Sequence, residues 1–201
     1  MRKIKVITES SSYVGSLENR LPNGTEVRLL DVLNYPKRVR SDTSKENPML
    51  ILRDATRFDR AGLWRVDIDG ECRLSLSAVV AAWEDPPVRW ENPLANYEKR
   101  LANSWRVRVK LQMATEHVIE CSILSKTPSL RNLTENGSFI AGTDAVLTDL
   151  GVGREPIDLP FLALNVDHVE SWSTIEEGSN SRLQTGTDAT IEQGGGRLIV
   201  N

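Results

Sequence analysis

The sequence predicts a mainly β protein with two tandem small β-barrel or β-sheet units, each carrying a short helix, joined by an amphipathic linker helix. Three observations support this prediction. Short segments alternate apolar and polar side chains, which is the period of half-buried strands. Turn-forming clusters of Ser, Asn, Asp and Gly separate these segments. The landmarks of the first half also return in the same order in the second half, while only the loops change length.

The first unit, residues 1–85, opens with two predicted strands. Residues 3–8 and 13–17 alternate in polarity, and the serines between them favour a turn. Gly15 lies inside the second strand, where glycine is typical of a bulge or of a close approach by another backbone. A sharply twisted strand is the simpler interpretation, and we favour it.

A short helix is predicted over residues 26–33, laid across one end of the sheet. Thr25 can accept from the free amides of its first turn, and Tyr35-Pro36 ends it because a residue before proline avoids the helical region. The polar loop of residues 35–48 comes next and contains the basic cluster Lys37-Arg38-Val39-Arg40. Long loops of this kind are often functional, although a solvated loop is the simpler interpretation.

A stretch of the first unit, residues 50–56, recurs in the second unit as residues 140–146. Each copy starts with apolar residues and contains Asp-Ala, at Asp54 and at Asp144. We predict two buried strands that end at these aspartates. Because the aspartate recurs beside loops that differ, we interpret it as a scaffold residue whose carboxylate satisfies backbone amides where the strand leaves the sheet.

The strongest short-range turn signal is Asp69-Gly70, which lies between alternating segments. Both central residues of a tight hairpin turn need positive φ, so this dipeptide predicts a hairpin over residues 64–76. Asp67, Asp69 and Glu71 form a small acidic cluster, but the twelve-residue spacing of a calcium loop is missing. The cluster therefore predicts no metal site.

Residues 86–104 form the predicted linker between the units. Asn92 and Pro93 supply the cap and the first residue of a helix that carries an apolar stripe and ends near Ala102. The second unit, residues 105–177, repeats the strands of the first without its basic loop. Because an apolar stripe is usually buried, we expect the linker helix to pack against one or both units.

The composition is that of an ordinary globular protein, with 39% hydrophobic and 26% charged residues and a net charge of -3. This charge argues against a protein whose whole surface tracks nucleic acid. No apolar run approaches the roughly 18 residues of a membrane span, and a signal peptide is not apparent, so we expect a bacterial-type cytoplasm. Cys72 and Cys121 lie apart without a C-x-x-C partner and are predicted to be buried thiols.

Catalytic signatures are missing from the sequence. It contains no nucleophile elbow, phosphate loop or dinucleotide fingerprint. The two histidines are His117, expected at a turn, and His168, expected on a strand face with Val166 and Glu170. A His-x-Glu pair could bind a metal, but no third ligand is recognisable. We therefore predict a protein that is not an enzyme and that holds no metal and no cofactor.

Two binding functions remain, and a protein partner or self-association is the one we favour. In this interpretation the protein is an adaptor or assembly protein that acts through exposed sheet edges, linker aromatics and a terminal strand. Residues 178–201 are predicted to be a flexible tail whose last apolar residues could add to a sheet edge. The predicted interface residues are Trp90, Trp105, Leu198, Ile199 and Val200.

The alternative is binding of nucleic acid or of a phosphate-bearing ligand through the basic loop, residues 35–48. Cations would contact phosphates, and an aromatic ring could stack on a base. The predicted ligand-binding residues are Tyr35, Lys37, Arg38 and Arg40. The net negative charge and the lack of interleaved aromatic residues weigh against this alternative.

The first unit resembles a family of uncharacterised bacterial small β domains. The resemblance rests on the segment Arg28-x-x-Asp31-x-Leu33-Asn34 and on the strand ending in Asp-Ala. It covers residues 3–83 and, less closely, residues 107–172, where Asn132 replaces the aspartate and Glu135 stands at the asparagine position. The resemblance implies a small β fold and brings no known activity.

A fainter similarity connects the chain with the Sm-like barrel. It rests on Gly15-x-Leu17 and on the segment from Asp31 to Asn34. Asp31 and Asn34 are one residue closer together than in that motif, and the leading helix is absent. RNA-binding residues are therefore not carried over, and the two side chains are interpreted as caps of the short helix and of the next loop.

Overall fold

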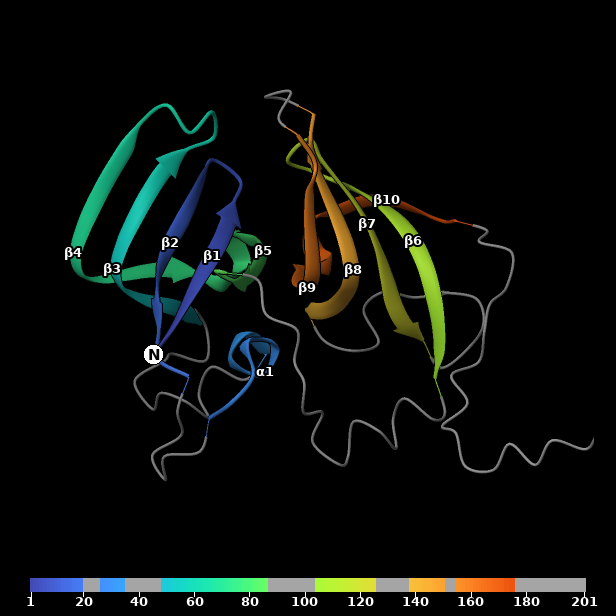
Figure 1. The fold of residues 1–201 in the computed structure, drawn as a ribbon, viewed down its shortest axis with the longest axis horizontal. Helices are drawn as coiled ribbons and strands as arrows, with labels where there is room; N and C mark the ends of the chain where they lie inside the picture. Colours follow the sequence, from blue (N-terminus) through green and yellow to red (C-terminus); the bar gives the residue numbers. More distant parts are fainter. Residues whose placement is uncertain (20–25, 35–47, 87–103, 126–137, 151–154, 176–201) are drawn as a thin grey trace, which may run out of the picture.

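The computed structural model describes residues 1–19, 26–34, 48–86, 104–125, 138–150 and 155–175. These residues form one ten-stranded antiparallel sheet and one short α-helix (Figure 1). The strands are β1 (Arg2–Thr8), β2 (Ser11–Leu17), β3 (Met49–Asp59), β4 (Arg65–Ser75), β5 (Val79–Glu84), β6 (Trp105–Met113), β7 (His117–Ser125), β8 (Phe139–Asp149), β9 (Ile157–Asn165) and β10 (Val169–Thr174). The helix is α1 (Leu29–Asn34), and short 3-10 helices precede β5 (Leu76–Ala78) and β10 (Val166–His168).

The predicted mainly β fold is confirmed. The strand order is β10-β6-β7-β8-β9-β5-β1-β2-β3-β4, so the first half is arranged β5-β1-β2-β3-β4 and the second half repeats this order. The sheet is open, with β4 and β10 at its ends. The described residues therefore do not form two closed barrels. A common origin of the two halves stays a prediction. The predicted linker helix lies outside the described residues.

The register within the two halves also corresponds. Val6 of β1 lies opposite Ala82 of β5, and Leu111 of β6 lies opposite Trp172 of β10. In both pairs of strands the register shifts by one residue, two residues before Ala82 in β5 and two residues before Trp172 in β10. The same sequence pattern therefore produces the same pairing geometry in each half, which Figure 1 shows as two curved groups of strands side by side.

Aspartates 54 and 144 lie within strands and not at their ends, so the predicted strand ends are wrong. Asp54 has φ 49 and Asp144 has φ 47. The register between β2 and β3 shifts beside Asp54, and the register between β7 and β8 shifts beside Asp144. Each aspartate thus lies in a bulge that adds one residue relative to the preceding strand, a position that Asp tolerates better than most side chains. The bulges bend β3 and β8 so that the sheet can curl around its core.

The predicted hairpin turn at Asp69-Gly70 is also wrong. Gly70 has φ 78 but lies inside the continuous strand β4, where the register with β3 shifts. The turn lies earlier, between β3 and β4, where Asp59 closes it. The Asp59 carboxylate accepts from the Trp64 amide at 3.0 Å, and the Asp59 amide donates to the Trp64 carbonyl. The positive φ of Gly70 thus belongs to a bulge within β4 and not to a hairpin turn.

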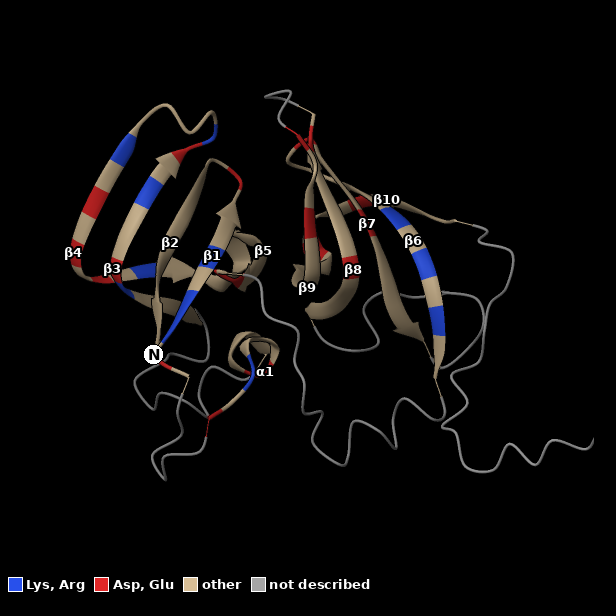
Figure 2. Ribbon diagram, viewed as in Figure 1, with Lys and Arg blue, Asp and Glu red and all other residues tan. Residues whose placement is uncertain are grey.

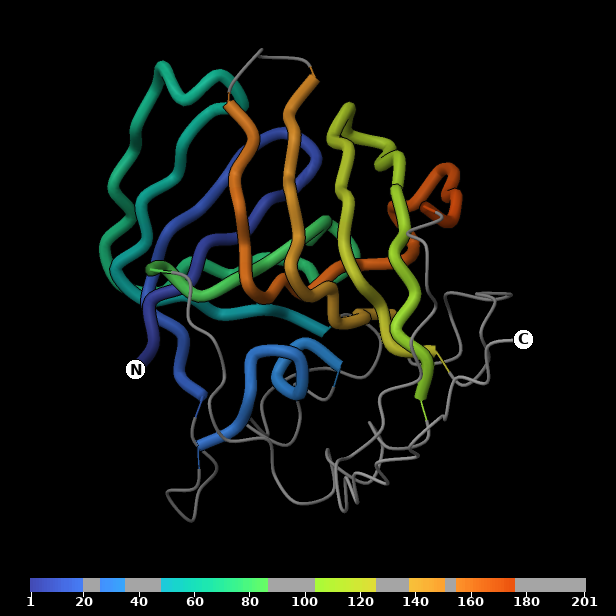
Figure 3. The backbone as a smooth tube through the Cα atoms, turned by 45° about the vertical axis from the view of Figure 1, so that its right-hand side comes forward, coloured from blue at the N-terminus to red at the C-terminus, as the bar shows by residue number. Residues whose placement is uncertain are grey.

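The helix begins three residues later than predicted and covers one end of the first half of the sheet (Figure 3). Leu29, Val32 and Leu33 are buried in the core of the first half. Asn34, the last residue of α1, pairs with β8 in the second half: its side chain donates to the Phe139 carbonyl and accepts from the Phe139 amide. The helix therefore bridges the two halves.

Gly15 is explained by close backbone packing. A Cβ built on Gly15 would lie 3.0 Å from Ala55 Cβ and 3.2 Å from Ala55 Cα, closer than ordinary contacts. Gly15→Ala is expected to lower the free energy of unfolding by about 1 to 3 kcal/mol, because β3 must move to admit the methyl group. Urea unfolding of this variant beside Ser16→Ala, a neighbour on the other face, checks this. Equal stability of the two variants would show that β3 gives way freely.

Candidate functional site: the junction of the halves and the ends of the sheet

The two halves are joined by direct strand pairing. Ala81 and Ala82 of β5 lie opposite Leu164 and Ala163 of β9, so the sheet runs without a break from one half to the other. All four residues are fully buried. Three of the four are alanine, so little side-chain volume has to be packed where the strands meet.

Apolar side chains cross this junction in both directions. Ala81 and Trp83 of β5 belong to the core of the second half, while Phe139 and Ala163 of the second half belong to the core of the first. Each half thus completes the other's core. The Trp83 ring alone removes a large apolar area from water, and aromatic rings buried in this way make some of the largest side-chain contributions to stability.

Polar side chains secure the junction at its edge. The Asn165 side-chain amide donates to the Val79 carbonyl at 2.9 Å, and His168 Nε2 lies 2.7 Å from the Ser77 carbonyl oxygen. His168 is buried in a 3-10 helix, so the predicted strand face with Val166 and Glu170 is wrong. Sequence reasoning missed these contacts, since their partners lie in the other half of the chain.

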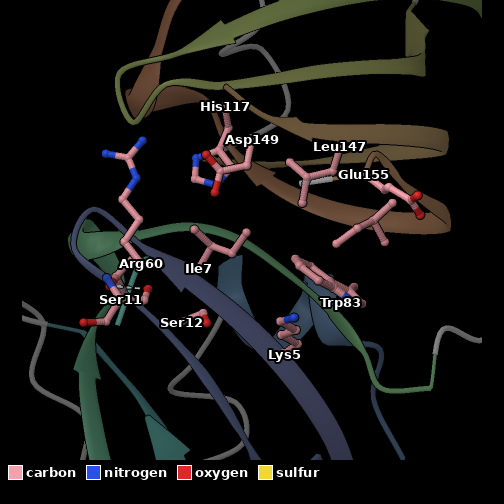
Figure 4. Close-up of a pocket in the computed structure, with 12 residues that line it drawn as sticks. Lys5, Ile7, Ser11, Ser12, Arg60, Trp83, His117, Leu147, Asp149 and Glu155 are labelled. Carbon is pink, nitrogen blue, oxygen red and sulfur yellow. Dashed lines mark hydrogen bonds and ion pairs between the residues drawn. The ribbon is translucent and has the colours of Figure 1, made fainter. Parts of the chain in front are cut away.

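A crevice lies beside the junction (Figure 4). Lys5 and Trp83 line its floor, with the Lys5 ammonium 5.6 Å from the centre of the indole ring. Arg60 extends from the first half and donates to Glu116 at 2.8 Å and to the Thr115 carbonyl in the second half. The crevice thus carries charges of both signs, since Asp149 and Glu155 also line it. The Arg60 guanidinium from the first half is held by the second half.

His117 at this crevice is held by structural partners. Its Nδ1 lies 2.9 Å from the Thr115 hydroxyl, and its Nε2 lies 3.7 Å from the Asp149 carboxylate. Both ring nitrogens therefore have neighbours from the scaffold. Across the part of the chain that the structure describes, His, Cys, Asp and Glu do not gather in groups of three that could hold a metal ion.

Burial lowers the pKa of His117 below its ordinary value of 6.5, although Asp149 and Glu116 oppose this and Arg60 reinforces it. The unfolded chain binds a proton near the ordinary value, while the folded protein binds it only at lower pH. The contribution of His117 to the free energy of unfolding is therefore fully present above pH 6.5. It is lost as the pH falls from 6.5 through the lower pKa of the folded protein.

The His117→Gln variant is expected to lose part of this pH dependence, because it has no proton to bind. Urea unfolding at about pH 7.5 and about pH 5.5 tests the point. The wild type should lose more stability between these two conditions than the variant. Equal losses would mean that His117 titrates alike in the folded and unfolded chain.

Both cysteines are free and buried, as predicted. Burial raises the pKa of Cys121 to about 12 and also raises the pKa of Cys72. Thiolate chemistry at either residue is therefore suppressed at neutral pH.

The two end strands, β4 and β10, lie on opposite sides of the molecule in Figures 1 and 3. Carboxylates outnumber cations on β4, whereas the strand next to β10, β6, carries three cations and no carboxylate (Figure 2). These three, Arg106, Arg108 and Lys110, contact acidic residues or carbonyl groups of β7 and β8. The end strand β10 itself carries one carboxylate, Glu170, and no cation, so the cations lie one strand in from that end of the sheet.

Two tryptophans that are not among the predicted interface residues have exposed side chains. Trp172 on β10 is 38% exposed, and Trp64 in the turn before β4 is 74% exposed. Trp105 begins β6 and packs partly buried against the core of the second half. The exposed tryptophans could have been noticed from their flanking polar residues, but their placement depends on which strands end the sheet.

The other predicted site residues lie outside the described residues. This holds for the predicted ligand-binding residues Tyr35, Lys37, Arg38 and Arg40, and for the predicted interface residues Trp90, Leu198, Ile199 and Val200. Their roles stay predictions.

Comparisons of the chain with protein-family models, with curated proteins and with solved structures find no match. The resemblances seen in the sequence therefore stay predictions. Within the described residues, no helix is long and apolar enough to cross a membrane.

Proposed function

We propose that this protein is a non-enzymatic adaptor or assembly protein that binds protein partners by strand addition at β4 and β10. One observation carries the proposal. The sheet already extends from one half to the other by pairing of two edge strands, β5 and β9, and among the described residues it stops at two further edge strands, β4 and β10. A partner strand at either end would extend the same sheet.

The backbone at these ends is suitable for a partner strand. The Ile175 amide donates to Arg108 on β6, so alternation turns the amide of Trp172 away from β6 and toward the free edge. On β4, the Leu76 amide donates to Pro48, so by the same alternation the Arg73 amide points away from β3. Trp172 and Arg73 therefore each direct a backbone amide to which a partner's backbone carbonyl can bind.

The side chains at these ends favour selective and reversible contacts. Charged residues on an edge strand normally discourage indiscriminate pairing, and β4 carries five of them among its eleven residues. A partner must therefore match the charge pattern as well as the backbone. Contacts of this kind are typical of adaptors that bind and release partners.

Proline at the outward-facing positions tests the proposal. Trp172→Pro and Arg73→Pro each remove one outward amide while keeping the ladder bonds to the neighbouring strand. Partners are captured by affinity with the intact protein and quantified by mass spectrometry. The amount of captured partner should be at least about tenfold lower with one of these variants than with the wild type. Trp172→Ala and Arg73→Ala are the matched controls, since they keep the amides.

The result is read from the comparison of each proline variant with its alanine control. A partner that is lost only with proline requires strand addition. A partner that binds both proline variants as well as the wild type would contradict the proposal.

A further inference from the structure

We propose that the strand added at each end belongs to a second copy of this chain, with β10 of one copy pairing antiparallel to β4 of the next. The inference rests on the proposed function of the edges and names their partner. The junction inside the chain is its template. β5 and β10 are the last strands of their halves, and β4 and β9 precede them, so β10 and β4 are the equivalents of the junction strands that stand at the ends of the sheet formed by the described residues.

Backbone contacts show that β10 is equivalent to β5 residue by residue. The Asp85 amide donates to Lys3 at the end of β5, and the Ile175 amide donates to Arg108 at the end of β10. Val80 in β5 and Glu170 in β10 are the extra residues at the register shifts. These contacts align Ala82 with Trp172.

The same holds for β4 and β9. The Leu76 amide donates to Pro48 after β4, and the Val166 amide donates to Ser138 after β9. Leu74 lies opposite Leu50, and Leu164 lies opposite Ile140. Counting back from these pairs aligns Arg73 with Ala163.

The register between two copies follows from these alignments. Ala82 lies opposite Ala163 at the internal junction, so Trp172 of one copy would lie opposite Arg73 of the next, and Ser171 opposite Leu74. The amides of Trp172 and Arg73 both point to the free edge. The two residues would therefore exchange a pair of backbone hydrogen bonds, as Ala82 and Ala163 are placed to do.

The side chains at the central position fit one another. Trp172 is 38% exposed, and the Arg73 side chain is 57% exposed and held by Glu71 at 3.1 Å. Residues directly opposite in an antiparallel pair project to the same face, which places the guanidinium beside the indole ring, a favourable cation–π arrangement. Both ends thus carry a large side chain where the internal junction has alanine.

The pairing between copies should be weaker than the internal junction. Ser171 and Ser173 of β10 take the places of Ala81 and Trp83, so little apolar surface is buried. Each end strand carries one carboxylate more than it has cations, so long-range charge adds no attraction between the two strands. We expect assembly that grows with protein concentration.

The geometry makes the contact heterologous. β4 and β10 lie on opposite sides of the molecule, so they cannot pair within one copy (Figures 1 and 3). Each copy then offers one edge to the copy before it and the other edge to the copy after it. Repetition of such a contact produces a ring when the rotation closes and a filament when it does not.

Cysteine trapping with the intact chain tests the register. The Arg73→Cys variant and the Trp172→Cys variant are mixed in equal amounts under mild oxidation, and disulfides are located by peptide mapping. Directly opposite residues lie within disulfide reach, so the mixture should give at least about tenfold more 73–172 disulfide than a mixture of Arg73→Cys with Ser173→Cys. The native thiols are buried and contribute little background.

Each outcome is decisive. A dominant 73–172 disulfide, together with a solution mass that rises with concentration and drops for Trp172→Pro, supports the inference. A dominant 73–73 or 172–172 disulfide would show an isologous contact and overturn it. A chain that stays monomeric at all concentrations also overturns it. This holds equally if hydrogen exchange of the monomer shows that another segment of the same chain protects the Trp172 amide.

The proposed function can fail separately. If the chain is monomeric but Trp172→Pro or Arg73→Pro still abolishes capture of a different protein, the edges bind partners and only the identity of the partner is wrong. If self-association persists unchanged in both proline variants, strand addition itself is wrong.

Discussion

Ala163→Asp is expected to lower the free energy of unfolding by about 3 to 5 kcal/mol, because it places an unpaired carboxylate inside the core of the first half. Ala163 is fully buried at the junction, opposite Ala82. Urea unfolding followed by tryptophan fluorescence measures the loss. The variant should also unfold in one transition with both halves, because each half completes the other's core.

The matched control is Arg73→Asp. Arg73 is the register equivalent of Ala163 but lies on the exposed end strand β4, where its ion pair with Glu71 is exposed. Exposed ion pairs contribute little, so the control should change stability by about 1 kcal/mol or less. Similar losses in the two variants would mean that the internal junction is no more buried than the end of the sheet.

Trp83→Ala is expected to cost about 3 to 5 kcal/mol, because the ring is 3% exposed and fills the core of the opposite half. Trp172→Ala, the control on the equivalent strand, removes a ring that is 38% exposed and should cost less than about 1.5 kcal/mol. Thermal and urea unfolding of both variants provide the comparison. A small loss for Trp83→Ala would show that the halves are stable independently.

Local periodicity was sufficient to predict most strands. The alternation at residues 3–8 and 13–17 corresponds to β1 and β2, and the helix was predicted to within a few residues. Each of these signals depends on neighbours in the sequence, because a half-buried strand repeats every two residues whatever it pairs with. The mainly β fold follows from such signals, whereas the order of strands in the sheet does not.

Backbone conformation at single residues could not be predicted in the same way. Gly70 was placed in a turn and Asp54 at a strand end, whereas both lie in bulges within strands. Turns and bulges need positive φ at the same residue types, so composition alone does not separate them. The alternation is interrupted at the bulge, where exposed Arg53 and Asp54 separate the buried Leu52 and Ala55, and such a polar pair is equally typical of a strand end.

The junction was beyond sequence reasoning for a different reason. Asn34, Asn165 and His168 contact residues that lie in the other half of the chain. Such contacts follow from which edge strands pair, and many pairings are compatible with the same alternation. Tryptophans 64 and 172 were missed as surface residues for the same reason, since exposure depends on where the sheet ends.

Amide hydrogen exchange at Arg73 and Trp172 is the most direct test of the central claim, that the ends of the sheet bind partners by strand addition. Exchange is followed for the intact protein alone at low concentration and for its complex with a captured partner or with a second copy of the chain. The account predicts that both outward amides exchange freely in the isolated chain, and that complex formation protects at least one of them while the inward amide of Ser173 stays protected throughout. A complex that forms without added protection at either residue would contradict it.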